Sequence, residues 1–167
     1  QAALTGHLVL STLHTNDAPA AVTRLLDLGL PSYLISATVL GVMAQRLVRV
    51  LCPSCKEVRS ATPEDNAMWD RLVAPWKANR PSQFHHPVGC LDCRMTGYRG
   101  RIGLYEILML SPDMKQLISD NAEIAKIRDL AYREGMKPLR ISGAMKVASG
   151  LTTLAEVFKV APPSERS

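Results

Sequence analysis

The stretches Leu51-Cys52-Pro53-Ser54-Cys55 and Gly89-Cys90-Leu91-Asp92-Cys93 decide how this chain of 167 residues is organised. They contain all four cysteines, as two Cys-x-x-Cys pairs that 34 residues separate. A Cys-x-x-Cys turn directs both sulfurs at one point, and two such turns complete a tetrahedral shell around zinc. The pattern therefore predicts a structural metal site, with zinc favoured and iron as an alternative, at Cys52, Cys55, Cys90 and Cys93.

Two disulfides, or a redox-active Cys-x-x-Cys pair, are the other interpretations of these cysteines. Disulfides belong mostly to exported proteins, and the first residues show no basic region followed by an apolar stretch and a cleavage site. A single redox motif does not explain two matched pairs. His85 and His86 lie near the second pair as possible competing ligands, but four thiolates complete the shell without them, and we expect ordinary loop histidines.

Strands are expected on both sides of the cysteine module. Residues 45–51 alternate so that Leu47 points away from Val48, and residues 101–110 form a second strand candidate. We expect the two strands to pair antiparallel, with the metal clamping the far end of the insertion between them. Within the insertion, Thr62-Pro63-Glu64-Asp65 predicts the start of a short helix.

The chain before the module predicts the end of an α/β domain. Residues 7–13 begin with a continuous apolar run, which is typical of a buried parallel strand. Asn16 or Asp17 then caps a helix that Gly29 ends, and a second helix is expected over residues 32–43. Strand, helix and helix in this order indicate the α/β class.

The last third is expected to be helical. One helix opens at Ser111, a second spans residues 123–134, a third spans residues 139–149, and Thr153 with Glu156 forms a capping box for a fourth. We expect the tail at residues 162–167 to be frayed.

Composition limits the function classes. Hydrophobic residues make up 47% and charged residues 21%, which indicates a globular chain, and no apolar run approaches the roughly 20 residues that span a bilayer. The net charge of +5 permits a phosphate-bearing ligand, nucleic acid or an acidic lipid. No lysine is followed by Ser or Thr, so the glycine-rich phosphate loop is absent, and no complete catalytic constellation is present.

The polar end of the first predicted strand is the candidate ligand site. In open α/β sheets ligands lie at the carboxyl ends of strands, where Thr12 and His14 stand. The plainer interpretation is that these residues cap the next helix. Arg94, Arg99 and Arg101 suit phosphate, but solvated surface explains such a cluster equally well.

Together these stretches resemble one family. Thr5-Gly6-His7-Leu8-Val9-Leu10-Ser11-Thr12-Leu13-His14-Thr15-Asn16 is similar to the histidine box of the secretion ATPase superfamily. Residues 44–55, residues 89–106 and the helical end around Glu134-Gly135-Met136 and Gly150-Leu151-Thr152 resemble the segments that follow it. The combination resembles the type II secretion ATPases (general secretion pathway protein E) and the type IV pilus assembly ATPases.

The resemblance implies a RecA-like P-loop ATPase domain with a tetracysteine zinc insertion and a helical carboxyl-terminal subdomain. It implies a hexameric motor that hydrolyses ATP with Mg, at the cytoplasmic face of the inner membrane, beside platform proteins of a secretion or pilus machine. His14, His7 and Thr12 then belong to the box that positions the γ-phosphate and water, and Gln45 and Arg46 fall near the nucleotide.

The family's Walker A loop, aspartate box and Walker B acid lie upstream of the histidine box and are not in this chain. We therefore expect a carboxyl-terminal fragment that is inactive as an ATPase alone. Its expected parts are the end of the ATPase core at 1–51, the zinc module at 52–100, a strand with the helical subdomain at 101–161, and a flexible tail at 162–167. The alternatives are a zinc-ribbon nucleic-acid-binding module and a structural docking domain for a membrane platform protein.

Overall fold

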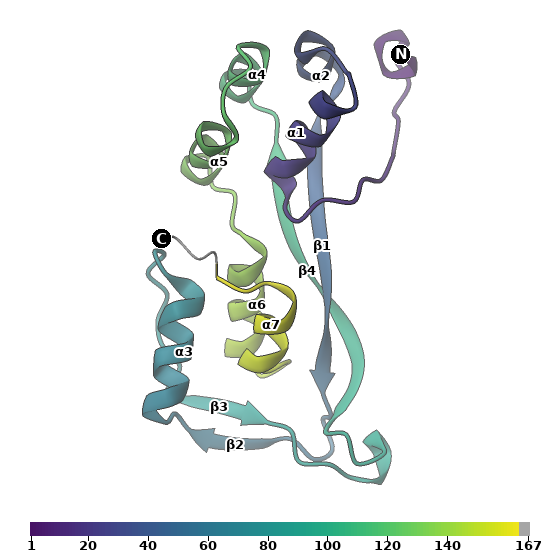
Figure 1. Ribbon diagram of the computed structural model, residues 1–167. Coiled ribbons are helices and arrows are strands. Elements are labelled where there is room, and N and C mark those ends of the chain that lie inside the picture. The colour runs from purple at the N-terminus through teal and green to yellow at the C-terminus, as the bar shows by residue number, and fades with distance from the viewer. Residues whose placement is uncertain (164–167) are drawn as a thin grey trace. The chain divides into compact units, whose positions relative to one another are not determined.

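The computed structural model describes residues 1–163, which form seven α-helices, two 3-10 helices and four strands in an α/β fold. The chain divides into two compact units (Figure 1). Unit 1 contains Gln1–Ala44 and Glu106–Lys137, and unit 2 contains Gln45–Tyr105 and the chain from Pro138 onward. Strands β1 (Gly41–Leu51) and β4 (Tyr98–Met109) each pass from one unit into the other.

Unit 1 is mainly helical. Helix α2 packs against α4, α1 packs against α5, and a core forms from Val22, Ile35, Met114, Ile118 and Ile127. Its elements besides the strand ends are η1 (Ala2–Thr5), α1 (Ala18–Asp27), α2 (Ser32–Thr38), α4 (Pro112–Ser119) and α5 (Ile124–Arg133).

Helix α1 begins and ends where the sequence predicts. The Asp17 side chain accepts a hydrogen bond from the backbone N–H of Ala20, at 2.9 Å, and Pro19 occupies the first turn. Gly29, at φ +88°, follows the end of the helix. Helix α2 is shorter than predicted, because it ends at Thr38 and residues 41–43 belong to β1. Gly41 fits there because a Cβ would lie 3.1 Å from the backbone oxygen of Leu108.

The predicted strand at residues 7–13 is wrong for this structure. This segment belongs to neither helix nor strand, and Leu8 and Leu10 are 77% and 88% exposed. A strand needs a partner for its backbone N–H and C=O groups. Among residues 1–163 the two sheets are β1 with β4 and β2 with β3, so the apolar run has no strand to pair with.

Unit 2 contains the cysteine module and the last two helices. The antiparallel pair β2–β3, in register from Glu57 opposite His86 to Ser60 opposite Gln83, was not predicted. Helix α3 packs against α6 and α7, and the ring centroids of Trp69 and Phe84 lie 6.2 Å apart. The elements are β2 (Glu57–Ser60), α3 (Pro63–Val73), β3 (Gln83–His86), η2 (Leu91–Cys93), α6 (Leu139–Ala148) and α7 (Leu154–Val160).

The predicted pairing of the two long strands is confirmed. Strands β1 and β4 form a two-stranded sheet. The Leu110 N–H donates to the Leu40 carbonyl at one end, at 3.1 Å, and the Cys52 N–H donates to the Gly97 carbonyl at the other, at 2.9 Å. The chain numbers rise in one strand as they fall in the other, so the pair is antiparallel.

The helices of the last third confirm the predicted starts and stops. Ser111 and Thr153 each cap a helix through the side-chain oxygen, as Thr62 does for α3. The capping box predicted at Thr153 is half formed, because the Glu156 carboxylate accepts from Arg49 instead of the Thr153 backbone. Pro162 lies outside helix and strand, whereas residues 164–167, where most of the predicted tail falls, lie outside the described residues. Of the helices described, none has the length and apolar character that crossing a membrane requires.

Candidate functional site

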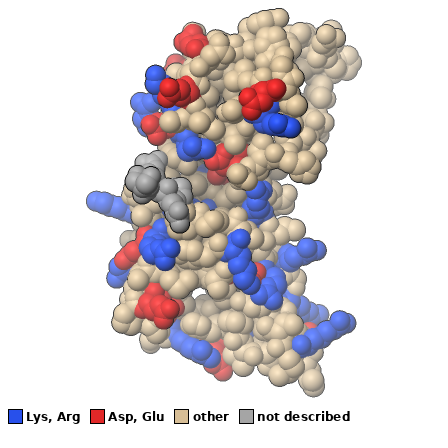
Figure 2. All heavy atoms as spheres, viewed as in Figure 1, with Lys and Arg blue, Asp and Glu red and all other residues tan. Residues whose placement is uncertain are grey.

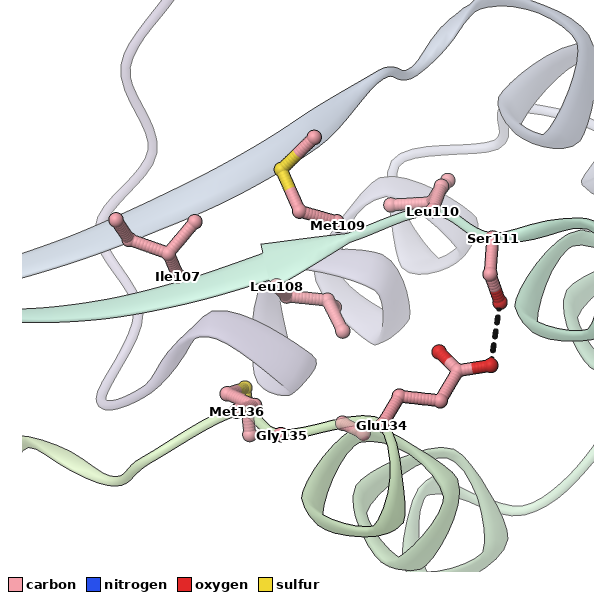
Figure 3. A pocket seen from close by; sticks show the side chains of 9 residues that line it. Ile107, Leu108, Met109, Leu110, Ser111, Glu134, Gly135 and Met136 are labelled. Carbon is pink, nitrogen blue, oxygen red and sulfur yellow. Dashed lines mark hydrogen bonds between the residues drawn. The ribbon is translucent and has the colours of Figure 1, made fainter.

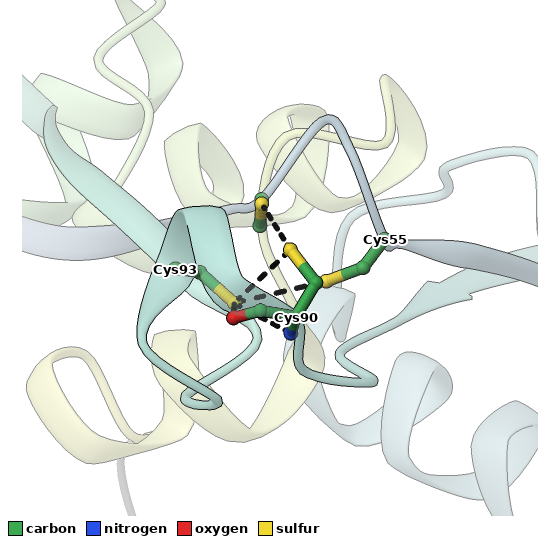
Figure 4. A group of neighbouring side chains, drawn as sticks. Cys55, Cys90 and Cys93 are labelled. Atoms are coloured by element: carbon green, nitrogen blue, oxygen red, sulfur yellow. Dashed lines mark hydrogen bonds between the residues drawn. The ribbon is translucent and has the colours of Figure 1, made fainter.

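The four cysteines converge at one point of unit 2. Their sulfurs all lie within 4.8 Å of one another, although the two pairs come from opposite ends of the insertion. The Sγ–Sγ distances from Cys52 to Cys90, from Cys55 to Cys93 and from Cys90 to Cys93 are each 3.8 Å. Figure 4 shows the side chains of Cys55, Cys90 and Cys93 turned toward one another. All four cysteines are free thiols, and no disulfide joins them.

This spacing fits a tetrahedral metal site. Four sulfurs about 2.3 Å from a central zinc ion lie about 3.8 Å from one another. Cys52 and Cys93 are buried, Cys55 and Cys90 are partly exposed, and the four sulfurs lie close enough to hold one metal ion. A site of this kind stabilises the fold and leaves no position open for a substrate.

Backbone N–H groups point at the sulfurs of the cluster. Gly89 donates to Cys55 Sγ at 3.3 Å, and Gly97 donates to Cys93 Sγ at 3.2 Å. Gly97 has φ +80°, and a Cβ at this position would lie 2.4 Å from the Cβ of Pro87. The close approach of backbone to sulfur therefore requires glycine.

The N–H donors shift the thiol equilibria. Burial alone would raise the pKa of Cys93, but N–H groups from Cys90 and Gly97 outweigh it and lower the pKa to about 6. A backbone hydrogen bond from Cys93 likewise acts to lower the pKa of Cys90. At Cys90, however, burial and the hydrogen bonds with the neighbouring thiols outweigh that effect and raise the pKa to about 11. Cys93 is thus deprotonated more readily than Cys90, and a bound cation would stabilise the thiolate form of its ligands.

His85 and His86 lie on strand β3 rather than in the expected loop. Within the described chain, the group of residues that can hold a metal contains the four cysteines and neither histidine. Burial, with the nearby charge of Lys56, lowers the pKa of His85. Its imidazole packs against Gly150, where a Cβ would lie 2.7 Å from the ring. His85 is therefore a packing residue.

The segment before α7 is hydrogen-bonded to the chain on both sides of the first cysteine pair. The Leu51 N–H donates to the Leu151 carbonyl at 2.8 Å, and Lys56 Nζ donates to the Gly150 carbonyl at 2.9 Å. The Thr152 hydroxyl donates to the Arg49 carbonyl at 2.7 Å. These bonds connect the chain on either side of the first cysteine pair to residues 150–152, which lead into α7.

Arg49 and Glu156 form the ion pair of this contact. The guanidinium donates to Glu156 Oε1 at 2.8 Å and lies over the ring of Tyr98, 4.1 Å from its centroid. Glu156 is 5% exposed. Burial alone would raise its pKa, but the hydrogen bonds from Arg49 and Lys159 lower the pKa to about 2. Sequence analysis did not identify this pair, because 107 positions separate its members.

The histidine-box residues lie in unit 1 on the exposed segment between η1 and α1, which is a long loop in Figure 1. His7, Thr12 and His14 are all exposed. One ring nitrogen of His7 has hydrogen-bond partners: Nδ1 lies 3.1 Å from Thr5 Oγ1 and 3.3 Å from the Ala2 carbonyl oxygen. The segment presents both polar and apolar side chains to solvent.

Gln45 and Arg46 lie on β1 in unit 2. Gln45 Nε2 donates to the Tyr105 hydroxyl at 3.4 Å, and Arg46 Nη1 donates to the Gln45 carbonyl at 2.8 Å. The structure therefore places the two nucleotide-binding candidates side by side on a strand, in a different unit from the histidines.

A cluster of charged residues that sequence analysis missed lies where α1 begins. Glu106 on β4 is 3% exposed, and its Oε1 accepts from the Ala18 N–H at 3.0 Å. Asp17 Oδ2 accepts from Arg128 at 2.8 Å. Two carboxylates and one guanidinium therefore meet at the start of α1, directly after the histidine-box residues.

A cavity of about 350 Å³ lies elsewhere in unit 1 (Figure 3). Its wall is largely apolar and includes Leu108, Met109 and Met136. The Ser111 hydroxyl donates to Glu134 at 2.6 Å and accepts from the Met114 N–H as the cap of α4. The polar side chains of the cavity wall, Ser111 and Glu134, thus already hydrogen-bond to each other beside the start of α4.

Comparison with known proteins gives a family and several relatives. The family described as Type II/IV secretion system protein matches residues 1–159. A type IV pilus assembly ATPase of Acinetobacter baylyi is 52% identical over 162 residues, which are 97% of this chain and 27% of the relative. A type II secretion system ATPase E of Vibrio cholerae is 44% identical over 164 residues, 98% of this chain and 31% of the relative.

Among solved structures, the pilus retraction motor PilT with bound ADP shares the fold, with a TM-score of 0.56 at 20% identity. The match covers 98% of this chain and 35% of that chain. This chain thus spans less than a third of the length of the two sequence relatives above.

Proposed function

This chain belongs to the type II/IV secretion system protein family, and we propose that it is the carboxyl-terminal part of an ATP-hydrolysing motor for type II pseudopilus or type IV pilus assembly. The observation that carries the proposal is the 52% identity to a pilus assembly ATPase across 97% of the chain. That alignment takes in both the histidine-box segment and the cysteine cluster. The fold shared with a pilus motor supports it.

In this proposal the cysteine cluster has a structural role. One zinc ion is held by Cys52, Cys55, Cys90 and Cys93. It cross-links the two ends of the insertion and takes no part in ATP hydrolysis. The 3.8 Å sulfur spacing and the N–H donors to sulfur support zinc at this position.

The histidine-box segment has the catalytic role. The exposed imidazole of His14 is suited to donate a hydrogen bond to a terminal phosphate oxygen or to hold a water molecule there. His7 and Thr12 belong to the same segment, and in this proposal Gln45 and Arg46 supply further donors from strand β1. The phosphate loop and the Mg ligands come from chain outside these 167 residues.

The proposed full-length protein acts as a hexameric ring. It works at the cytoplasmic face of the inner membrane, against the platform proteins of a secretion or pilus machine. The same proposal divides the chain into four parts: the end of a RecA-like ATPase core at 1–51, the zinc module at 52–100, a strand with the helical subdomain at 101–161, and the tail at 162–167.

Substitution of His14 tests the catalytic role. In the full-length protein, His14→Ala should lower ATP turnover by about 10²-fold because a positioned donor is lost. His86→Ala is the matched control, since this histidine lies on β3 in the other unit, and its turnover should stay near wild type. Equal turnover by His14→Ala and wild type would refute the assignment.

A nucleic-acid-binding module is the second candidate, and the charge of unit 2 favours it. Unit 2 holds 14 Lys and Arg against 7 Asp and Glu, whereas unit 1 holds 6 against 8. Figure 2 shows basic side chains over much of the face drawn, with acidic ones among them. Only 5% of residues are aromatic, so few rings can stack on bases. A gel shift that weakens steeply with salt would support this candidate.

A further inference from the structure

The buried carboxylate of Glu106 connects a strand to the segment that carries His14. Glu106 lies on β4, and its Oε1 accepts from the backbone N–H of Ala18, 88 positions earlier in the chain. Both residues are buried, Glu106 at 3% exposed and Ala18 at 0%. Ala18 is the first residue of α1 and stands four positions after His14.

This hydrogen bond is additional to the ordinary helix cap. Asp17 already caps α1 by accepting from the Ala20 N–H at 2.9 Å, and its other oxygen accepts from Arg128. Glu106 accepts from a different N–H, that of Ala18. Burying a carboxylate costs free energy, because the charged group loses its hydration. The positive end of the helix dipole and the charge-assisted hydrogen bond offset that cost. The start of α1 is therefore fixed to the sheet, beyond what a surface helix needs.

The two ends of the histidine-box segment are held while its middle is exposed. His7 is held beside Thr5, and Thr15 Oγ1 donates to the Asp17 carbonyl at 3.0 Å. A side chain on a loose segment must be ordered before it can act, and that ordering costs conformational entropy. The anchor nearest to His14 is the junction of Asp17 and Ala18, which Glu106 binds.

We infer that Glu106 is a positioning residue, which fixes the backbone after His14 and so sets where the imidazole stands during ATP hydrolysis. The inference rests on the proposed function. It assigns to Glu106 a hydrogen-bonding role in which the oxygen acceptor matters more than the charge. Glu106 itself does not touch the nucleotide.

Two variants separate the hydrogen bond from the charge. Glu106→Gln keeps an oxygen acceptor at the same reach, whereas Glu106→Asp keeps the charge but shortens the side chain by one methylene. In the full-length protein, Glu106→Asp should lower kcat about tenfold with KM for ATP within about twofold, and Glu106→Gln should restore most of kcat. Asp113→Asn, in the first turn of α4, is the matched control and should behave as wild type.

Hydrogen exchange of the same proteins gives a readout that does not depend on turnover. Amide exchange over residues 12–20 should rise in Glu106→Asp and stay near wild type in Glu106→Gln and Asp113→Asn. Faster exchange together with a lower kcat supports the positioning role. Faster exchange with unchanged kcat overturns it, because the anchor is then structural only.

His14→Ala, measured alongside, separates this inference from the proposed function. If His14→Ala is impaired and Glu106→Asp is not, the function stands and the positioning role is wrong. If His14→Ala keeps full turnover, the catalytic role of His14 fails and the positioning role fails with it. If Glu106→Gln loses as much kcat as Glu106→Asp, an oxygen acceptor at the same reach is not sufficient for the role, and the inference as stated is wrong.

Discussion

The cysteine cluster and the histidine-box segment are the two candidate sites, and they differ in how complete they are. Four sulfurs of the cluster meet within 4.8 Å, and N–H groups already point at two of them. The histidines instead lie on an exposed segment that encloses nothing. A metal site built from two short turns needs only its own chain. A nucleotide site of the proposed kind also needs a glycine-rich phosphate loop, and no Gly-Lys-Ser or Gly-Lys-Thr occurs in this sequence.

The cluster should therefore dominate the stability of unit 2, which is the largest effect expected. Cys93→Ala should abolish stoichiometric zinc binding and unfold much of unit 2, because structural zinc contributes on the order of 10 kcal/mol in zinc-finger peptides. Metal analysis and circular dichroism check this, with Ser54→Ala between the first two cysteines as the control. An unchanged melting curve in Cys93→Ala would contradict the claim that the cluster dominates the stability of unit 2.

Glycine substitutions sharpen the comparison at the level of the backbone. Gly97→Ala should cost roughly 2–4 kcal/mol, since φ is +80° and the new Cβ would lie 2.4 Å from Pro87. Gly6→Ala, within the histidine box, also meets a positive φ of +94° but no atom within 4 Å, so it should cost only about 1 kcal/mol. Urea unfolding measures both, and equal costs would contradict the difference in packing.

The Arg49–Glu156 pair predicts how acid acts on unit 2. The pKa of Glu156 is lowered from 4.5 to about 2, so its stabilisation is complete above pH 4.5 and disappears as the pH falls toward 2. Glu156→Gln should remove about 2 kcal/mol at neutral pH and flatten the stability profile between those values. The exposed Glu64→Gln serves as control. A Glu156→Gln profile that keeps the wild-type slope would refute the assignment.

The smallest effect is expected in the histidine-box segment itself. Leu10 is 88% exposed, so Leu10→Ser should change the unfolding free energy of this chain by less than about 0.5 kcal/mol. Leu72→Ala in α3, at 0% exposed, should cost roughly 2–5 kcal/mol. A loss above 1.5 kcal/mol in Leu10→Ser would show that the segment is packed.

Local signals explain what the sequence could predict. The caps at Asp17, Thr62, Ser111 and Thr153 and the Cys-x-x-Cys turns each depend on a few adjacent residues, and all were located correctly. Two clear hydrophobic patterns were enough to find β1 and β4.

Interactions between distant positions explain what the sequence could not predict. Residues 7–13 carry the pattern of a buried strand, but a strand also needs a partner, and the described chain offers none. The β2–β3 pair is short and its first strand is wholly exposed, so no hydrophobic alternation marks it. Glu106 and Glu156 act on residues 88 and 107 positions away, a relation that no local pattern records.

Native mass spectrometry of this chain, with zinc and Mg-ATP both supplied, tests the central claim most directly. The account predicts one zinc ion per chain and no bound nucleotide, because the metal site is complete and the nucleotide site is partial. A spectrum with bound Mg-ATP and no zinc would contradict it.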